Sequence, residues 1–211
     1  MTGEREPGAG PPPRLVLATA NQHKLAELTR ILAAGRVAVA ATDLGDFPGA
    51  PDVRETGATF GENALLKAHA IAQFTGLPAV ADDSGICVDA LNGMPGVLSA
   101  RWSGRHGDDE ANLLLLLAQL ADVPDSRRGA HFTCAAALVR PDGREHVSEG
   151  AVHGHLIREP RGANGFGYDP IFVPDGAELT TAEMTPAAKD MISHRGRALR
   201  ALTPVIAGLL A

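Results

Sequence analysis

Two adjacent carboxylates interrupt an apolar stretch of this chain. Asp82 and Asp83 lie between the apolar runs 77–81 and 86–88, so they occupy what otherwise has the pattern of a buried strand. Burying an ionised carboxylate is costly unless a cation or hydrogen-bond donors compensate it. The simplest compensation is a divalent metal ion, since Mg²⁺ binds a few carboxylate oxygens together with phosphate oxygens. The alternative is a strand-to-turn junction in which Asp, Ser and Gly only close a turn.

An extended backbone would send these two carboxylates to opposite sides of the strand. Asp82 and Asp83 are then not a pair of acids that work together on one face. One of them faces the site, and the other is held by backbone donors or faces a different layer of the protein.

A polar segment at 19–24 has the composition of a phosphate-binding loop. It follows a short apolar run and opens a helical pattern, where backbone N–H groups and the positive end of the helix dipole are available to an anion. Thr19 and Asn21 add side-chain donors, and Lys24 adds a positive charge. The spacing of a Walker loop is absent. The alternative is that Asn21 only caps the helix, and the two roles are compatible.

Glu55, Asn63 and Lys67 form a further polar group. Asn63 and Lys67 are four residues apart and share one face of a helix, which the capping box Thr59–Glu62 opens. Glu55 precedes that helix and could reach a metal ion or a phosphate-bound water. From the residues alone, a solvated helix face is the favoured interpretation of Asn63 and Lys67.

The segment 165–170 places two aromatic residues between glycines. The chain has only one Tyr, one Trp and six Phe, yet Phe166 and Tyr168 both lie here. Glycines leave the ring faces uncovered, and aromatic faces stack well on nucleobases. The alternative, a place in the core, is reasonable for Phe166 and weaker for Tyr168.

A basic cluster lies in the otherwise apolar C-terminal region. It contains Lys189, His194 and Arg195, beside Ser193. Arg195 could bind a phosphate or a base acceptor through two N–H groups, whereas the alternative is a helix end whose basic groups complement the dipole. Together with the acids and the aromatic segment, this cluster completes the set of groups needed to bind a nucleoside triphosphate.

Composition predicts one soluble globular domain. The chain has 211 residues, of which 45% are hydrophobic and 21% charged, ordinary values for this class. A net charge of −6 argues against nonspecific nucleic-acid binding, and no apolar run is long enough to cross a membrane. Cys87 and Cys134 lie in apolar runs, which indicates buried thiols in a reducing compartment. We therefore expect a cytoplasmic protein.

Alternating apolar runs and helical patterns predict a single mixed α/β domain. The first thirteen residues are rich in Gly and Pro, so 1–13 is expected to be a disordered extension of a domain spanning 14–211. Strands are expected at 15–18, 37–41, 77–88, 132–140, 145–152 and 171–173. Helices are expected at 25–35, 59–74 and 108–121, from 185 onward, and at 193–210.

The ordered motifs of the chain resemble those of the inosine triphosphate pyrophosphatase (Ham1-like) family. The matching segments are LATANQHKLAEL, ETGATFGENALLKA, ADDSGICVDAL, PGVLSARWSG, GFGYDPIF and SHRGRAL. The resemblance implies an elongated α/β fold with a central mixed sheet, two lobes and a nucleotide cleft between them, and it implies a homodimer. It also implies Mg²⁺-dependent hydrolysis of ITP, dITP and XTP to the monophosphate and pyrophosphate.

The same resemblance implies a role for each motif residue. Asp83 matches the general base and, with Glu55, the metal-binding acids, while Asp82 is given a supporting role. Residues matching phosphate contacts are Thr19, Asn21, Lys24, Asn63 and Lys67, and Ser84 matches a substrate contact. Residues matching the base and sugar pocket are Phe166, Gly167, Tyr168, Asp169, Lys189, His194 and Arg195.

Selectivity among purines is expected to depend on hydrogen bonding at C6. Hypoxanthine and xanthine carry an oxygen there and adenine an amino group, so a buried donor would discriminate between them. Arg195 and backbone N–H groups near Phe166 are the candidate donors. Three other functions stay open: a Maf-like pyrophosphatase with different substrates, a non-catalytic nucleotide sensor, and an NTPase or kinase acting at the γ-phosphate.

Overall fold

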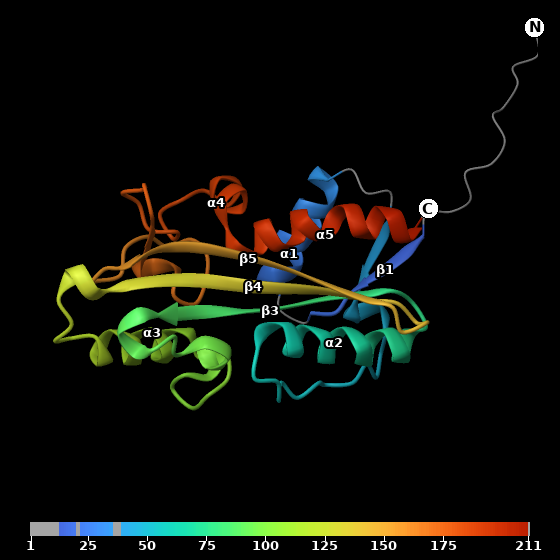
Figure 1. The fold of residues 1–211 in the computed structure, drawn as a ribbon, viewed down its shortest axis with the longest axis horizontal. Helices are drawn as coiled ribbons and strands as arrows, with labels where there is room; N and C mark the ends of the chain where they lie inside the picture. The colour runs from blue at the N-terminus through green and yellow to red at the C-terminus, as the bar shows by residue number, and fades with distance from the viewer. Residues whose placement is uncertain (1–12, 20–21, 36–38, 211) are drawn as a thin grey trace, which may run out of the picture.

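A mixed six-stranded sheet runs along the elongated molecule (Figure 1). The computed structural model describes residues 13–19, 22–35 and 39–210, so the predicted extension lies, apart from Pro13, outside the described residues. The strands are β1 (Arg14–Leu17), β2 (Ala40–Asp43), β3 (Ala79–Val88), β4 (Gly129–Val139), β5 (Glu145–Leu156) and β6 (Phe172–Pro174), in the spatial order β2-β1-β3-β4-β5-β6. β1 is parallel to β2 and β3, and the other pairs are antiparallel. The predicted α/β fold with a central mixed sheet is confirmed.

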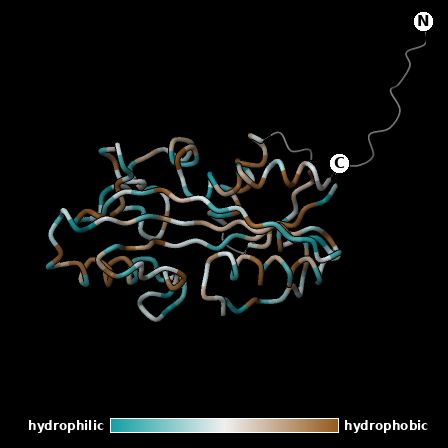
Figure 2. The backbone as a smooth tube through the Cα atoms, in the orientation of Figure 1, coloured by the Kyte–Doolittle hydropathy of each residue, from teal (hydrophilic) through white to brown (hydrophobic). Residues whose placement is uncertain are grey.

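Helices cover both faces of the sheet (Figure 1). α2 (Phe60–Thr75) and α3 (Asp109–Gln119) lie on one face, and α1 (Gln22–Ala34), α4 (Pro186–Ile192) and α5 (His194–Leu210) lie on the other. In Figure 2 the hydrophobic segments run through the helices and strands, whereas many of the connecting loops are hydrophilic. Within the described part of the chain, no helix has the length and apolar character needed to cross a membrane.

Strand pleating divides the core between the two faces of the sheet. Val80 packs in a cluster with Leu28 and Leu202 from α1 and α5. Its neighbour Ala81 packs on the opposite face in an alanine-rich cluster with α2. A third cluster, around Phe172, fills the other half of the molecule with residues of α3, β4 and β5. The first two clusters lie in one half of the molecule and the third lies in the other half, in agreement with the two lobes expected.

The observed strands differ from the predicted ones mainly at their ends. β4 begins at Gly129 and β5 ends at Leu156, so the hairpin is longer than predicted. The extra residues pair with strands on both sides, Ala130 with β3 and Leu156 with β6, and this sheet context extends a weak local pattern. The predicted strand 37–41 is observed as β2 from Ala40; positions 37 and 38 lie outside the described residues.

The predicted helix caps are present. The Thr185 side chain accepts a hydrogen bond from the Ala188 N–H at the start of α4, and Ser193 Oγ accepts one from the Gly196 N–H at the start of α5. The thiols of Cys87 and Cys134 are both free. Cys134 is buried as predicted, whereas Cys87 is only half-buried.

The capping box of α2 differs in one bond from the predicted form. Thr59 Oγ1 accepts a hydrogen bond from the Glu62 N–H at 3.1 Å. The Glu62 carboxylate accepts one from the Ala58 N–H at 2.6 Å, one residue before the N–H used in a standard capping box. The cap thus also fixes the loop that leads from Glu55 to α2.

We expect Thr59→Ala to lower the free energy of unfolding by about 1 kcal/mol, because it leaves an N–H at the first turn of α2 without its acceptor. Urea denaturation followed by circular dichroism measures this change. Thr29→Ala is the matched control, since that exposed hydroxyl only donates within its own helix, and we expect a change below about 0.5 kcal/mol. Equal losses in the two variants would contradict the capping role.

Candidate active site

A cavity of about 830 Å³ collects most of the predicted site residues. Its walls include residues from the α2-side core, such as Ile71, and from the opposite half of the molecule, such as Tyr168. The predicted site residues that line it are Thr19, Lys24, Glu55, Lys67, Asp83, Ser84, Phe166, Gly167, Tyr168, Asp169, Lys189, His194 and Arg195. Asn21 lies outside the described residues, and Asn63 lies behind the cavity wall.

β3 carries the two acids on opposite faces of the sheet, as the extended backbone predicts. Asp82 is directed toward α1 and α5, where it contacts Lys24 and Arg195. Asp83 is directed toward α2, where it contacts Asn63 and Lys67. Both carboxylates are buried. The strand therefore gives two neighbouring acids two different environments.

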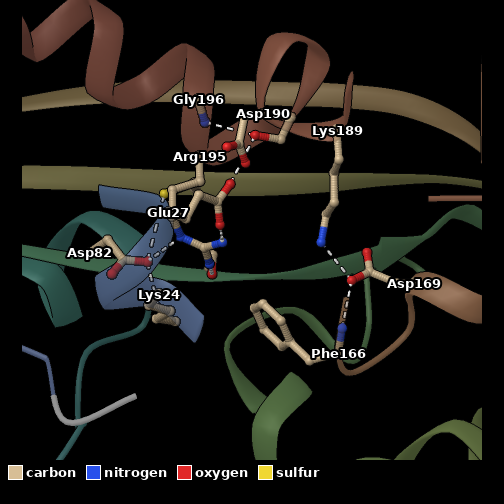
Figure 3. A network of polar contacts seen from close by, with 12 residues as sticks. Lys24, Glu27, Asp82, Phe166, Asp169, Lys189, Asp190, Arg195 and Gly196 are labelled. Atoms are coloured by element: carbon tan, nitrogen blue, oxygen red, sulfur yellow. Dashed lines mark hydrogen bonds and ion pairs between the residues drawn. The ribbon is translucent and has the colours of Figure 1, made fainter. Parts of the chain in front are cut away.

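Asp82 is compensated by a buried network of charges (Figure 3). Its Oδ2 atom lies 3.0 Å from Lys24 Nζ and 3.0 Å from Arg195 Nε. Arg195 also donates to Glu27 at 2.5 Å and to Ser84 Oγ at 2.7 Å. Burial by itself would raise the pKa of Asp82, but Lys24 and Arg195 outweigh it and hold that pKa well below its usual range. Asp82 is therefore a permanent anion that anchors two cations.

The same network keeps Arg195 charged. Burial would lower its pKa, but the neighbouring Asp82 and Glu27 carboxylates raise it above the ordinary value. Glu27 was not predicted as a site residue. The available signal was its place on the apolar face of α1, four residues before Ile31, where a charged side chain is unusual.

Asp83 has weaker compensation. Its Oδ2 atom accepts a hydrogen bond from Asn63 Nδ2 at 3.0 Å, and its Oδ1 atom accepts one from the Ser84 N–H at 3.0 Å. Burial raises the pKa of Asp83; Lys67 opposes this effect and nearby Glu55 adds to it, so the net direction is upward. A carboxylate with a raised pKa is better matched to proton transfer near neutral pH.

Asn63 has a different place from the one predicted. It is fully buried, so the solvated helix face favoured from the residues alone is wrong. Its Nδ2 donates to Asp83, and its Oδ1 accepts from the Gly57 N–H at 2.8 Å. Because both ends of the amide are used in this way, Asn63 orients Asp83 and the loop before α2 from behind the cavity wall.

Lys67 joins the two predicted metal-binding acids. Its Nζ lies 2.7 Å from Glu55 Oε1 and 3.6 Å from Asp83 Oδ1. Arg101, which sequence reasoning missed, lies 3.1 Å from Glu55 Oε2. Burial would raise the pKa of Glu55, but Lys67 and Arg101 lower it overall. Arg101 lies within the quoted segment PGVLSARWSG, but no spacing in it distinguishes this arginine from its neighbours.

The aromatic segment folds into a loop fixed by Asp169 (Figure 3). Asp169 Oδ2 accepts from the Phe166 N–H at 2.8 Å and from Lys189 Nζ at 2.6 Å. Asp109, also missed from the sequence, accepts from the Gly167 N–H at 2.9 Å. The Phe166 and Gly167 amides, two of the backbone donors expected near a purine C6 oxygen, are therefore engaged by carboxylates in this structure.

Both aromatic residues line the cavity, but Tyr168 is more buried than Phe166. Tyr168 is only 5% exposed, and its hydroxyl donates to the Ser99 carbonyl at 2.8 Å; the expectation that core packing is the weaker interpretation for Tyr168 is wrong. Phe166 is half-buried on the cavity wall, with Lys189 Nζ 5.1 Å and Arg195 Cζ 5.8 Å from its ring centroid. Of the two rings, Phe166 offers more surface to a ligand.

His194 is a buried, neutral side chain that also lines the cavity. Its ring stacks on Phe132 with centroids 4.9 Å apart. Burial lowers the pKa of His194 far below its usual value, and the adjacent Arg195 and Lys189 charges add to that effect. His194 can therefore offer a neutral ring nitrogen or a packing surface, but no charge at neutral pH.

The chain is similar to known proteins of one family, some of which are named dITP/XTP pyrophosphatases. The sequence profile of the Ham1 family matches residues 15–205. A dITP/XTP pyrophosphatase of Streptomyces coelicolor is 60% identical, over 93% of this chain and 98% of its own length. A crystal structure of a nucleoside-triphosphatase (dITP/XTP pyrophosphatase) from Mycobacterium abscessus is 59% identical, covers 92% of this chain and 99% of its own, and has a TM-score of 0.74. A HAM1 protein from Coxiella burnetii is 42% identical, with coverages of 93% and 99% and a TM-score of 0.84.

We expect Asp82→Asn to lower the free energy of unfolding at pH 7 by about 3 kcal/mol or more, because it leaves Lys24 and Arg195 without their shared anion. The pKa of Asp82 is depressed in the folded protein. Its contribution to the free energy of unfolding is therefore fully present above the unfolded pKa of about 4. That contribution is lost as the pH falls toward the folded pKa. Denaturation from pH 7 to pH 3 should therefore show a shrinking difference from wild type. A difference that grows on acidification would contradict this assignment.

Proposed function

The chain belongs to the Ham1 family, and from this premise we propose that it hydrolyses ITP, dITP and XTP to the monophosphate and pyrophosphate with Mg²⁺. It is a hydrolase of nucleoside triphosphates, and its substrate class is the non-canonical purine nucleotides. One observation carries the assignment: Asp83, with a raised pKa, shares a single cavity with three lysines and with Phe166. A cavity of about 830 Å³ suits a ligand of nucleotide size.

The cavity supplies a base and a cationic wall for phosphoryl chemistry. Asp83 would orient a water molecule and take its proton as the water attacks the α-phosphorus; the bond to the bridging oxygen breaks, and pyrophosphate leaves. Asn63 and the Ser84 N–H hold the Asp83 carboxylate in one orientation. The Lys24 and Lys67 ammonium groups offset negative charge on the leaving pyrophosphate. Positioning and electrostatics account for most of the catalysis in reactions of this kind.

The two acids Glu55 and Asp83 fit a magnesium site completed by the substrate. Their oxygens converge on one cation, the Lys67 ammonium, so this part of the wall favours positive charge. Among the described residues no group of three His, Cys, Asp or Glu side chains could hold a metal ion. Mg²⁺ typically uses one or two carboxylates with phosphate oxygens and water. When bound, it supplies a Lewis acid that neutralises phosphate charge.

Base selectivity is assigned to the side chains around Phe166. The ring provides a surface on which a purine can stack. Arg195 has five N–H donors, and three of them make the bonds to Asp82, Glu27 and Ser84 described above. Its remaining donors are candidates for a C6 oxygen, which ATP lacks. The donors proposed here are therefore on the arginine, in place of the amides that Asp169 and Asp109 engage.

The proposal also includes a homodimer in the cytoplasm. The family resemblance supports the dimer, and the proposed reaction supports the location, because deaminated nucleotides must be removed from the pools that polymerases use. Size-exclusion chromatography with light scattering tests the dimer, for which we expect twice the chain mass of 21.9 kDa. A mass equal to one chain at micromolar concentration would contradict it.

The activity is tested with purified protein, Mg²⁺ and a panel of ITP, dITP, XTP, GTP, ATP, dTTP and UTP. We expect monophosphate and pyrophosphate from the first three and little reaction with ATP or GTP. Turnover mainly of dTTP or UTP would support the Maf-like function. Diphosphate products would mean that the γ-phosphate reacts, and tight ITP binding without turnover would indicate a sensor.

We expect Asp83→Asn to lower kcat for ITP by about 10²–10⁴-fold, the usual contribution of a general base, while nucleotide binding is retained. Steady-state kinetics and calorimetric titration measure the two quantities separately. Asp142→Asn is the matched control, because Asp142 lies in the exposed β4–β5 turn and pairs only with arginines of that turn. Near-normal turnover in Asp83→Asn would remove Asp83 from the mechanism.

A further inference from the structure

Lys67 occupies the place of a cation between the two acids assigned to magnesium. Its Nζ lies 2.7 Å from Glu55 Oε1 and 3.6 Å from Asp83 Oδ1, and only 17% of the side chain is exposed. We propose that Lys67 is a stand-in cation: it pairs with Glu55 and Asp83 in the nucleotide-free enzyme, weakens metal binding there, and so couples metal binding to nucleotide binding. This inference rests on the proposed function, which supplies the metal and the nucleotide.

Direct competition follows from the atoms that Lys67 contacts. An ammonium group and a divalent ion prefer the same carboxylate oxygens, and two positive charges a few ångströms apart repel each other. Burial would lower the pKa of Lys67, but the surrounding acids Asp83, Asp82 and Glu55 raise it, so the side chain is charged at neutral pH. Arg101 donates to the second oxygen of Glu55. A metal ion that binds this carboxylate must therefore displace Lys67 or Arg101.

A bound triphosphate can release the Lys67 ammonium from its two carboxylates. Lysine is a point charge on a flexible four-carbon stem, so the Lys67 ammonium can exchange its carboxylates for phosphate oxygens without movement of α2. That exchange frees Glu55 Oε1 and Asp83 Oδ1 when a nucleotide arrives. Thermodynamic coupling is reciprocal, so the metal ion then also strengthens nucleotide binding.

Arg144 provides a comparison outside the site. Its guanidinium pairs with Asp142 in the exposed β4–β5 turn, away from the residues that line the cavity. Lys24 does not serve this purpose, because its charge also lowers the pKa of Glu55 and opposes the rise in the pKa of Asp83. Removing the Arg144 charge leaves the Lys67 contacts with Glu55 and Asp83 in place.

The test is a titration of the nucleotide-free full-length protein with Mn²⁺, followed by electron paramagnetic resonance of the free ion. We expect Lys67→Met to bind Mn²⁺ about tenfold more tightly than wild type, within the usual range of coupling between sites. Arg144→Met, which removes a positive charge outside the cavity, should stay within about twofold of wild type. Lys67→Gln is the second neutral variant, and circular dichroism establishes that each variant is folded. Unchanged or weaker Mn²⁺ binding in folded Lys67→Met and Lys67→Gln would overturn the proposal.

A second titration separates this inference from the proposed function. With a non-hydrolysable α,β-methylene analogue of ITP present, wild type should bind Mn²⁺ more tightly, and its difference from Lys67→Met should shrink. A difference that persists in full would overturn the exchange of Lys67 to phosphate. Failure of wild type to release pyrophosphate from ITP would instead refute the proposed function, whereas the Mn²⁺ affinities without nucleotide would still decide whether Lys67 competes.

Discussion

Burial of two consecutive carboxylates in one strand is the constraint on which this structure depends. A pleated strand directs neighbouring side chains to opposite faces, so Asp82 and Asp83 cannot share one set of compensating charges. Each face must bring its own donors to the sheet. α1 and α5 bring Lys24 and Arg195 to Asp82, and α2 brings Asn63 and Lys67 to Asp83. The helices that cover the sheet thus also build the two halves of the site.

The two environments lead to different chemistry from identical side chains. Asp82 has two close cations and a depressed pKa, so it holds its charge and serves as an anchor. Asp83 has an amide, one N–H and a more distant ammonium, and its pKa is raised. A buried acid with limited compensation is costly to ionise, so Asp83 is the better candidate of the two for accepting a proton. In the mechanism proposed above, a structural anion and a general base are therefore adjacent residues.

Much of the fold was predictable because its signals are local. The apolar run around the two acids, the Thr59 and Thr185 caps and the opposite directions of Asp82 and Asp83 follow from periodicity and short-range hydrogen bonding. Strand ends were less predictable, since β4 and β5 are extended by pairing with β3 and β6.

The residues missed in the site depend on tertiary contacts. Glu27, Arg101 and Asp109 lie on three different elements and reach the site only after folding. Tyr168 is more buried than expected because its ring packs in the cluster around Phe172 and its hydroxyl donates to the carbonyl of Ser99, a residue far away in sequence. The burial of Asn63 likewise depends on its contact with β3, which the helix pattern alone does not contain.

The difference in charge compensation between Asp82 and Asp83 is tested most directly by the stability of Asp83→Asn at pH 7. Because the folded pKa of Asp83 is raised, its ionisation at neutral pH opposes folding, and the neutral isostere removes that cost. We expect urea denaturation of Asp83→Asn to give a free energy of unfolding equal to or above that of wild type. A loss of about 3 kcal/mol or more, the size expected when a buried ion pair is broken, would show that Asp83 is a structural anion like its neighbour and would contradict the account.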